Sequence, residues 1–102
     1  MTKYEKLVRD RIPDMIRAQG ETPLTRVLNT EEYLRCLEGK LDEEVAEYHR
    51  EKNPEELADI LEVILALAAA NGWSREELER IYRRKHDERG GFEERIYLIG
   101  KE

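Results

Sequence analysis

The sequence has almost no cysteine and no long hydrophobic run. Cys36 is the only cysteine among 102 residues, so no disulfide can form within the chain, which fits a reducing compartment. The longest apolar run, Val63 to Ala70, has eight residues. A membrane-spanning helix needs about 20, and a signal peptide would lie at the start of the chain. We expect a soluble, cytoplasmic protein with no membrane partner.

The sequence also lacks an excess of positive charge. Its 24 acidic and 18 basic residues give a net charge of −6. Because binding to nucleic-acid phosphates needs a positive surface, we expect no nucleic-acid partner. A small anionic ligand would need a local metal ion or arginine. His49 and His86 have no histidine or cysteine at ligand spacing, which argues against a zinc site.

Charged residues make up 41% of the chain and hydrophobic residues 39%. The hydrophobic residues recur at helical spacing, which favours surface-rich helices over a disordered chain. The length suits one domain, residues 1–102. We expect irregular chain up to Ile12 and a short helix from Pro13 to Gln19 that stops at Gly20. Residues 23–28 and 95–99 have strand character and are predicted to pair in a small two-stranded β ribbon.

Three further helices are predicted by a capping residue followed three positions later by glutamate. The pairs are Asn29 with Glu32, Asn53 with Glu56, and Ser74 with Glu77. They predict helices over 30–52, 54–70 and 75–88, and therefore an all-α antiparallel helical bundle. In the second of these helices, 12 of the 14 residues in LADILEVILALAAA are apolar. One neighbouring helix cannot cover so much apolar surface, so we expect a homodimer or homotetramer.

Two acidic motifs lie on consecutive predicted helices, Glu44 with Glu47 and Glu56 with Asp59. Residues three apart share one face of a helix, and a tight Asn53-Pro54 turn brings the two helices back antiparallel. The four carboxylates should therefore converge. Hard divalent cations such as Mg²⁺ or Mn²⁺ bind oxygen ligands of this kind.

Helical geometry ranks the acids. Glu44 lies at the border of the apolar stripe, whereas Glu43 is turned a further 100° towards solvent. Asp59 and Glu62 are embedded in the apolar helix, and burying an acid costs several kcal/mol unless it is paired or metal-bound. Acids are nevertheless common in this chain, so their spacing alone is a weak signal. Glu43 and Glu47 are equally explained as solvated partners of basic residues. Glu56 is equally explained as the capping-box partner of Asn53.

Two basic groups are candidates for binding phosphate. Lys85 and Arg89 precede two glycines and can hold an anionic leaving group, although a helix C-terminus also favours cations for local reasons. Lys6 and Arg9 belong to the segment KLVRDRIP. A surface ion-pair cluster that includes Asp10 is the alternative interpretation of this second group.

These motifs together resemble the MazG-like superfamily of all-α nucleoside triphosphate pyrophosphohydrolases. The similarity is to its short, single-domain branch, the phosphoribosyl-ATP pyrophosphohydrolase-like proteins, and it extends over nearly the whole chain. The segments that carry it are YEKLVRDRIP at 4–13, KLDEEVAEY at 40–48, EELADILEVILALA at 55–68 and KHDERGGF at 85–92. Only eight residues separate Glu47 from Glu56, fewer than in typical MazG proteins, so the connecting turn is tight.

The resemblance implies an oligomer of helical bundles that holds Mg²⁺ or Mn²⁺. By position, the metal ligands are Glu44, Glu47, Glu56 and Asp59. Glu43 is a supporting acid by the same resemblance, and Lys85 and Arg89 resemble its phosphate-binding residues. From their own positions in the sequence, we add Glu62 as a supporting acid and Lys6 and Arg9 as phosphate-binding candidates.

We therefore predict Mg²⁺-dependent hydrolysis of the α–β phosphoanhydride of a nucleoside triphosphate or a phosphoribosyl-ATP-like nucleotide. Glu44, Glu47 and Asp59 are the predicted catalytic residues, with Glu47 or Glu44 as the base. A non-catalytic helical dimerisation module and a nucleotide-binding module are the alternatives. A nucleic-acid-binding protein that uses RRKHDER and KLVRDR is a third, disfavoured by the net charge.

Overall fold

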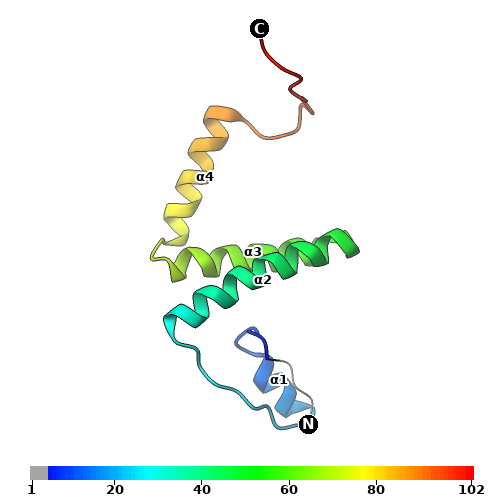
Figure 1. Cartoon of the computed structure of the whole chain (residues 1–102), viewed down its shortest axis with the longest axis vertical. Helices are drawn as coiled ribbons and strands as arrows, with labels where there is room; N and C mark the ends of the chain where they lie inside the picture. Colours follow the sequence, from blue (N-terminus) through cyan, green and yellow to red (C-terminus); the bar gives the residue numbers. More distant parts are fainter. Residues whose placement is uncertain (1–4) are drawn as a thin grey trace.

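The computed structural model describes residues 5–102, and over this range the fold is all-α. It contains four helices and no strand: α1 (Ile12–Ala18), α2 (Thr30–Glu51), α3 (Pro54–Ala70) and α4 (Arg75–Arg89) (Figure 1). The bounds of all four differ by at most one residue from those predicted from the sequence. Tyr4, with which the first motif begins, and the rest of residues 1–4 lie outside the described residues.

The three longer helices begin at side-chain caps, as the sequence predicts. The capping oxygens of Asn29, Asn53 and Ser74 accept hydrogen bonds from the backbone N–H groups of Glu32, Glu56 and Glu77 over 2.9, 3.1 and 3.1 Å. At the first cap the Glu32 carboxylate also accepts from the Asn29 N–H over 3.3 Å, which completes a capping box. Each cap contributes about 1 kcal/mol.

The turn between α2 and α3 is very short. Lys52 adopts a left-handed conformation, with φ of 50°, and its N–H donates to the Tyr48 carbonyl over 2.8 Å. Asn53 then caps α3, and Pro54 occupies its first turn, where a missing N–H costs nothing. The two helices therefore run antiparallel and side by side (Figure 1).

This α2–α3 hairpin holds nearly all of the tertiary packing. Among the described residues, only Leu37, Val63 and Ala68 are buried hydrophobic residues, and all three belong to the hairpin. The last helix, α4, leaves the end of α3 with a change of direction of 114° and diverges from the hairpin (Figure 1). The single chain is therefore an extended hairpin with arms rather than a closed helical bundle, with a radius of gyration of 18.1 Å.

The predicted β ribbon is wrong. Neither residues 23–28 nor residues 95–99 form a strand, and the two segments lie towards opposite ends of the molecule (Figure 1). The physical reason is the direction of α4, which carries the C-terminal residues away from the N-terminal part. A lone two-stranded ribbon is also marginally stable in water.

Within residues 5–102, no single helix is both long and apolar enough to cross a membrane. Only α3 and α4 taken together, with the 114° bend between them, meet the criteria of length and composition.

Candidate metal centre

Three carboxylates from the two helices of the hairpin converge near its turn. Glu44 comes from α2, and Glu56 and Asp59 come from α3. One oxygen from each of these side chains lies within 4.8 Å of the other two. The arrangement follows from the sequence: the i, i+3 spacing places the two α3 acids on one face, and the tight turn sets that face against α2.

The electrostatic environment disfavours ionisation of Glu56. Desolvation raises the pKa of its carboxyl group above the ordinary value, and neighbouring negative charges raise it further. The charges that do so belong to Glu47, Asp59, Glu44 and Glu51. Such a cluster favours the uptake of a proton or a cation.

Two basic side chains offset part of this negative charge. The Arg9 guanidinium donates to Asp59 over 2.7 Å and lies 3.6 Å from the Glu62 carboxylate. On the α2 side, the Lys40 ammonium lies 3.4 Å from Glu43 and 3.6 Å from Glu44. Asp59, Glu62, Glu43 and Glu44 therefore each have a basic side chain beside them.

Glu44 and Glu43 differ in exposure in the order that the helical geometry predicts. The Glu44 side chain is 15% exposed and that of Glu43 is 47% exposed. Glu47, predicted as a fourth ligand, is not one of the three clustered acids. Its carboxylate instead lies 2.8 Å from the Arg50 guanidinium. Its charge still acts on the Glu56 carboxyl, so it belongs to the same neighbourhood.

The predicted phosphate-binding residues fall into two separate places. Lys6 and Arg9 lie in the segment before α1, and Arg9 reaches the acids. Lys85 and Arg89 lie in the last turns of α4, and the structure does not bring them to the acids because α4 diverges from the hairpin (Figure 1).

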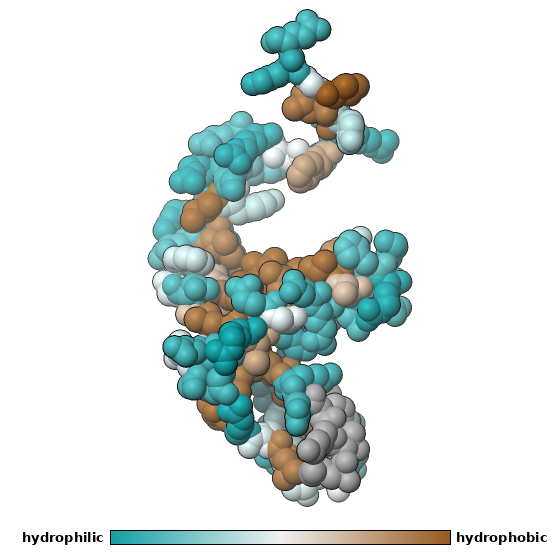
Figure 2. Space-filling model, viewed as in Figure 1, coloured by the Kyte–Doolittle hydropathy of each residue, from teal (hydrophilic) through white to brown (hydrophobic). Residues whose placement is uncertain are grey.

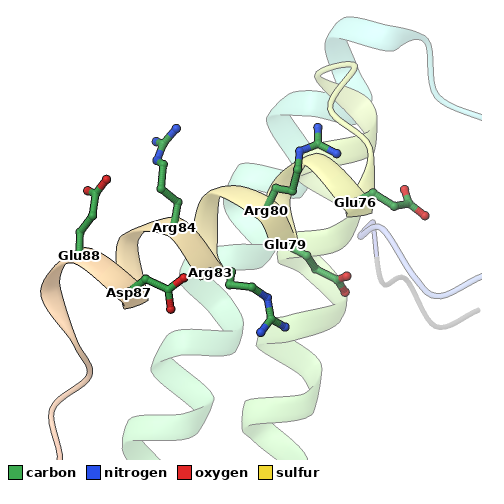
Figure 3. Close-up of a pocket in the computed structure, with 7 residues that line it drawn as sticks. All are labelled: Glu76, Glu79, Arg80, Arg83, Arg84, Asp87 and Glu88. Carbon is green, nitrogen blue, oxygen red and sulfur yellow. The ribbon is translucent and has the colours of Figure 1, made fainter.

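A shallow hollow on α4 is lined by charged side chains of both signs. They are Glu76, Glu79, Arg80, Arg83, Arg84, Asp87 and Glu88 (Figure 3). All seven side chains come from one helix and point outward from it, so nothing faces a ligand from the opposite side. We interpret this surface as a solvated helix face.

Sequence reasoning missed two contacts at the acids. Lys40 stands four residues before Glu44, a spacing that brings side chains together on a helix and was available from the sequence. The pair of Arg9 with Asp59 joins residues 50 positions apart, for which the sequence carries no local signal.

The donor set fits a hard divalent cation. Around Mg²⁺ at its usual bond length, neighbouring oxygens lie about 2.9 Å apart and opposite ones about 4.1 Å apart. The three carboxylate oxygens, within 4.8 Å of one another, are separated by at most about 0.7 Å more than the larger of these distances. All three acids are partly exposed, so water can complete the coordination shell.

Comparisons with known proteins give one partial match. A stretch of 42 residues, 41% of this chain, is 62% identical to an uncharacterized protein of Mycolicibacterium smegmatis. The match spans 43% of that protein, less than half of its length. No protein-family model matches the chain, and no solved structure matches it. Assignment to the MazG-like superfamily therefore stays a prediction from the motifs.

Proposed function

We propose that the protein is a Mg²⁺-dependent nucleotide pyrophosphohydrolase. The substrate is a nucleoside triphosphate or a phosphoribosyl-ATP-like nucleotide, cleaved between the α and β phosphorus atoms to a monophosphate and pyrophosphate. The observation that carries the proposal is the convergence of Glu44, Glu56 and Asp59, together with the raised pKa of Glu56. The motif resemblance supplies the reaction type.

In this proposal the three clustered acids hold the cation. When bound, Mg²⁺ supplies positive charge at the phosphates and makes water more acidic. Glu47 lies outside the three clustered ligands but within their electrostatic reach, which suits it to accept the proton of the attacking water. The water oxygen bonds to phosphorus as the bridging P–O bond breaks, and the pyrophosphate leaves.

Arg9 has two roles in the proposal. Without metal it forms ion pairs with Asp59 and Glu62 and offsets part of their charge. A cation at the acids competes with the guanidinium, which is then available to a substrate phosphate. The proposed role of Lys85 and Arg89 requires α4 to approach the acids, which α4 of a second copy of the chain would supply.

The test is phosphate release measured with and without added inorganic pyrophosphatase. The panel contains nucleoside triphosphates, deoxynucleoside triphosphates and phosphoribosyl-ATP, each with Mg²⁺ or EDTA. We expect a metal-dependent signal that needs the coupling enzyme and is lost in Asp59→Asn. Glu55→Gln, an exposed acid in the first turn of the same helix, is the matched control and should retain activity.

Phosphate released without the coupling enzyme, or full activity in Asp59→Asn, would overturn the proposal. If no nucleotide of the panel is hydrolysed but Mg²⁺ raises the melting temperature, the result would favour the nucleotide-binding alternative. If no substrate is hydrolysed and Mg²⁺ does not raise the melting temperature, the result would favour a helical interaction module. The exposed apolar side chains of α3 are consistent with such a module.

A further inference from the structure

The C-terminal arm, residues 92–99, is an apolar segment without packing partners in its own chain. Its five apolar side chains are 79–97% exposed: Phe92, Ile96, Tyr97, Leu98 and Ile99. The arm has no regular secondary structure. Four of them, Ile96 to Ile99, are consecutive, and such an exposed apolar run marks an interaction surface.

A second exposed apolar surface runs along α3. Leu57, Leu61 and Ile64 follow the i, i+4, i+7 spacing, so they share one face of the helix, and they are 38–52% exposed. We name this face the α3 stripe. Figure 2 shows a hydrophobic band along the hairpin, on the side that faces the open space between the hairpin and α4.

The amount of exposed surface indicates that copies of the chain associate. The solvent-accessible area is 9597 Å². A folded monomer of 12.1 kDa exposes about 6,000 Å², so this chain exposes about 3,600 Å² more. Two chains together therefore carry about 7,200 Å² of excess surface, which is more than the total of about 2,000–5,000 Å² that a permanent interface between two partners buries. The radius of gyration of 18.1 Å likewise exceeds the value of about 13 Å for a compact domain of this length.

We propose that the C-terminal arm of one chain packs on the α3 stripe of a second copy, reciprocally, in a two-fold arm-exchanged dimer. In such a dimer each arm covers the partner's stripe, so both arms and both stripes are buried and no further copy can add. The lengths are comparable, because the apolar residues 96–99 span about 13 Å when extended and the stripe from Leu57 to Ile64 spans about 10 Å of helix.

The course of the chain favours the partner's stripe over the chain's own. Gly90, with φ of 77°, ends α4 at the point farthest from the hairpin, and the arm continues away from it (Figure 1). Folding back onto the same chain would require a reversal at Gly90–Gly91. This inference concerns the assembly alone and holds whether or not the protein is an enzyme.

The first test is sedimentation equilibrium of the full chain over a wide range of protein concentration. We expect the mass to rise with concentration to twice the chain mass of 12.1 kDa. The double variant Ile96→Asp with Ile99→Asp should weaken association at least tenfold, because it places charges in an apolar contact. The matched control, Glu93→Gln with Glu94→Gln, changes the polar part of the same arm and should associate as the natural chain does.

The variant should keep its helical circular dichroism, because the arm packs on nothing within its own chain. A single-chain mass at every concentration would overturn the proposal. Association that is unchanged by the aspartates would do so as well.

Disulfide trapping separates exchange from folding back. In chains carrying Cys36→Ser, one preparation receives Leu61→Cys and a second, of distinguishable mass, receives Ile96→Cys. Oxidation of the mixture should yield a disulfide between the two kinds of chain. A single chain that carries both substitutions is oxidised as a comparison. If it forms the disulfide only within itself, and the mixture yields no disulfide between chains, the exchange is refuted.

Discussion

The guanidinium of Arg9 donates a hydrogen bond of 2.7 Å to the carboxylate of Asp59. The contact joins the segment before α1 to α3 and places a fixed positive charge beside the clustered acids. Both side chains are about half exposed, at 55% and 40%, so the pair contributes about 1 kcal/mol or less. A divalent cation can therefore displace Arg9 at small cost.

Replacing Arg9 by glutamine should strengthen Mg²⁺ binding. The substitution removes a competing cation from Asp59, and the loss of about 1 kcal/mol of competition corresponds to as much as about fivefold in affinity. Isothermal titration with Mg²⁺, or Mn²⁺ titration followed by electron paramagnetic resonance, measures the change. In an activity assay the same variant should raise KM, because a phosphate contact is lost.

Arg17→Gln is the control for Arg9→Gln. It breaks an exposed ion pair with Asp14 within α1, at 2.8 Å, away from the acids. It should leave Mg²⁺ affinity unchanged. A weaker Mg²⁺ affinity in Arg9→Gln would show that the guanidinium organises the acids rather than competing for them.

Glu56→Gln should stabilise the metal-free protein at neutral pH. The pKa of Glu56 is raised in the folded state, so the folded chain holds this proton at pH values where the unfolded chain has lost it. Stability is therefore lost as pH rises through the folded-state pKa, and the neutral amide avoids this loss. Melting curves without metal should show an advantage for the variant that grows from acidic to neutral pH.

Added Mg²⁺ should reverse that order. The natural chain gains stability from the bound cation. Glu56→Gln gains little, because its neutral amide replaces a charged carboxylate ligand. A metal-free variant that melts below the natural chain at neutral pH would contradict the electrostatic argument.

Glu44 and Glu47 should separate into different roles. Glu44 lies within the cluster, so Glu44→Gln should lose both Mg²⁺ binding and activity. Glu47 faces Arg50 instead, so Glu47→Gln should retain Mg²⁺ binding while kcat falls by about 10²–10⁴, the usual contribution of a general base. Loss of Mg²⁺ binding in Glu47→Gln would assign this residue to the ligands.

The sequence predicted the features that depend on local rules. The caps at Asn29, Asn53 and Ser74 act within one helical turn, so the helix bounds could be placed within one residue. The meeting of Glu44 with the α3 acids also followed, because a two-residue turn leaves the two helices little freedom.

The features that the sequence did not predict depend on how distant segments are placed. The direction of α4 decides that residues 95–99 form no ribbon and that Lys85 lies away from the acids, and no local pattern encodes that direction. Arg9 pairs with Asp59 rather than with its neighbour Asp10, and this too depends on how distant segments pack together.

At the start of α2, Arg26 and Glu32 form a two-pronged ion pair with distances of 2.7 and 3.1 Å. The Arg26 hydrogen bond, the Asn29 N–H and nearby positive charge lower the pKa of Glu32 to about 2. A lowered pKa means that the stabilisation is present above the ordinary value of 4.5 and is lost as pH falls towards 2.

Arg26→Gln should therefore lower the melting temperature at pH 7, and the gap from the natural chain should shrink as pH falls from about 4.5 to about 2. Carboxyl titration by nuclear magnetic resonance should show the pKa of Glu32 moving up towards its ordinary value, while the Asn29 cap keeps part of the shift. A gap in melting temperature that stays constant over this pH range would mean that the loss comes from the packing of the Arg26 side chain rather than from its charge, because only the charge interaction disappears when Glu32 is protonated.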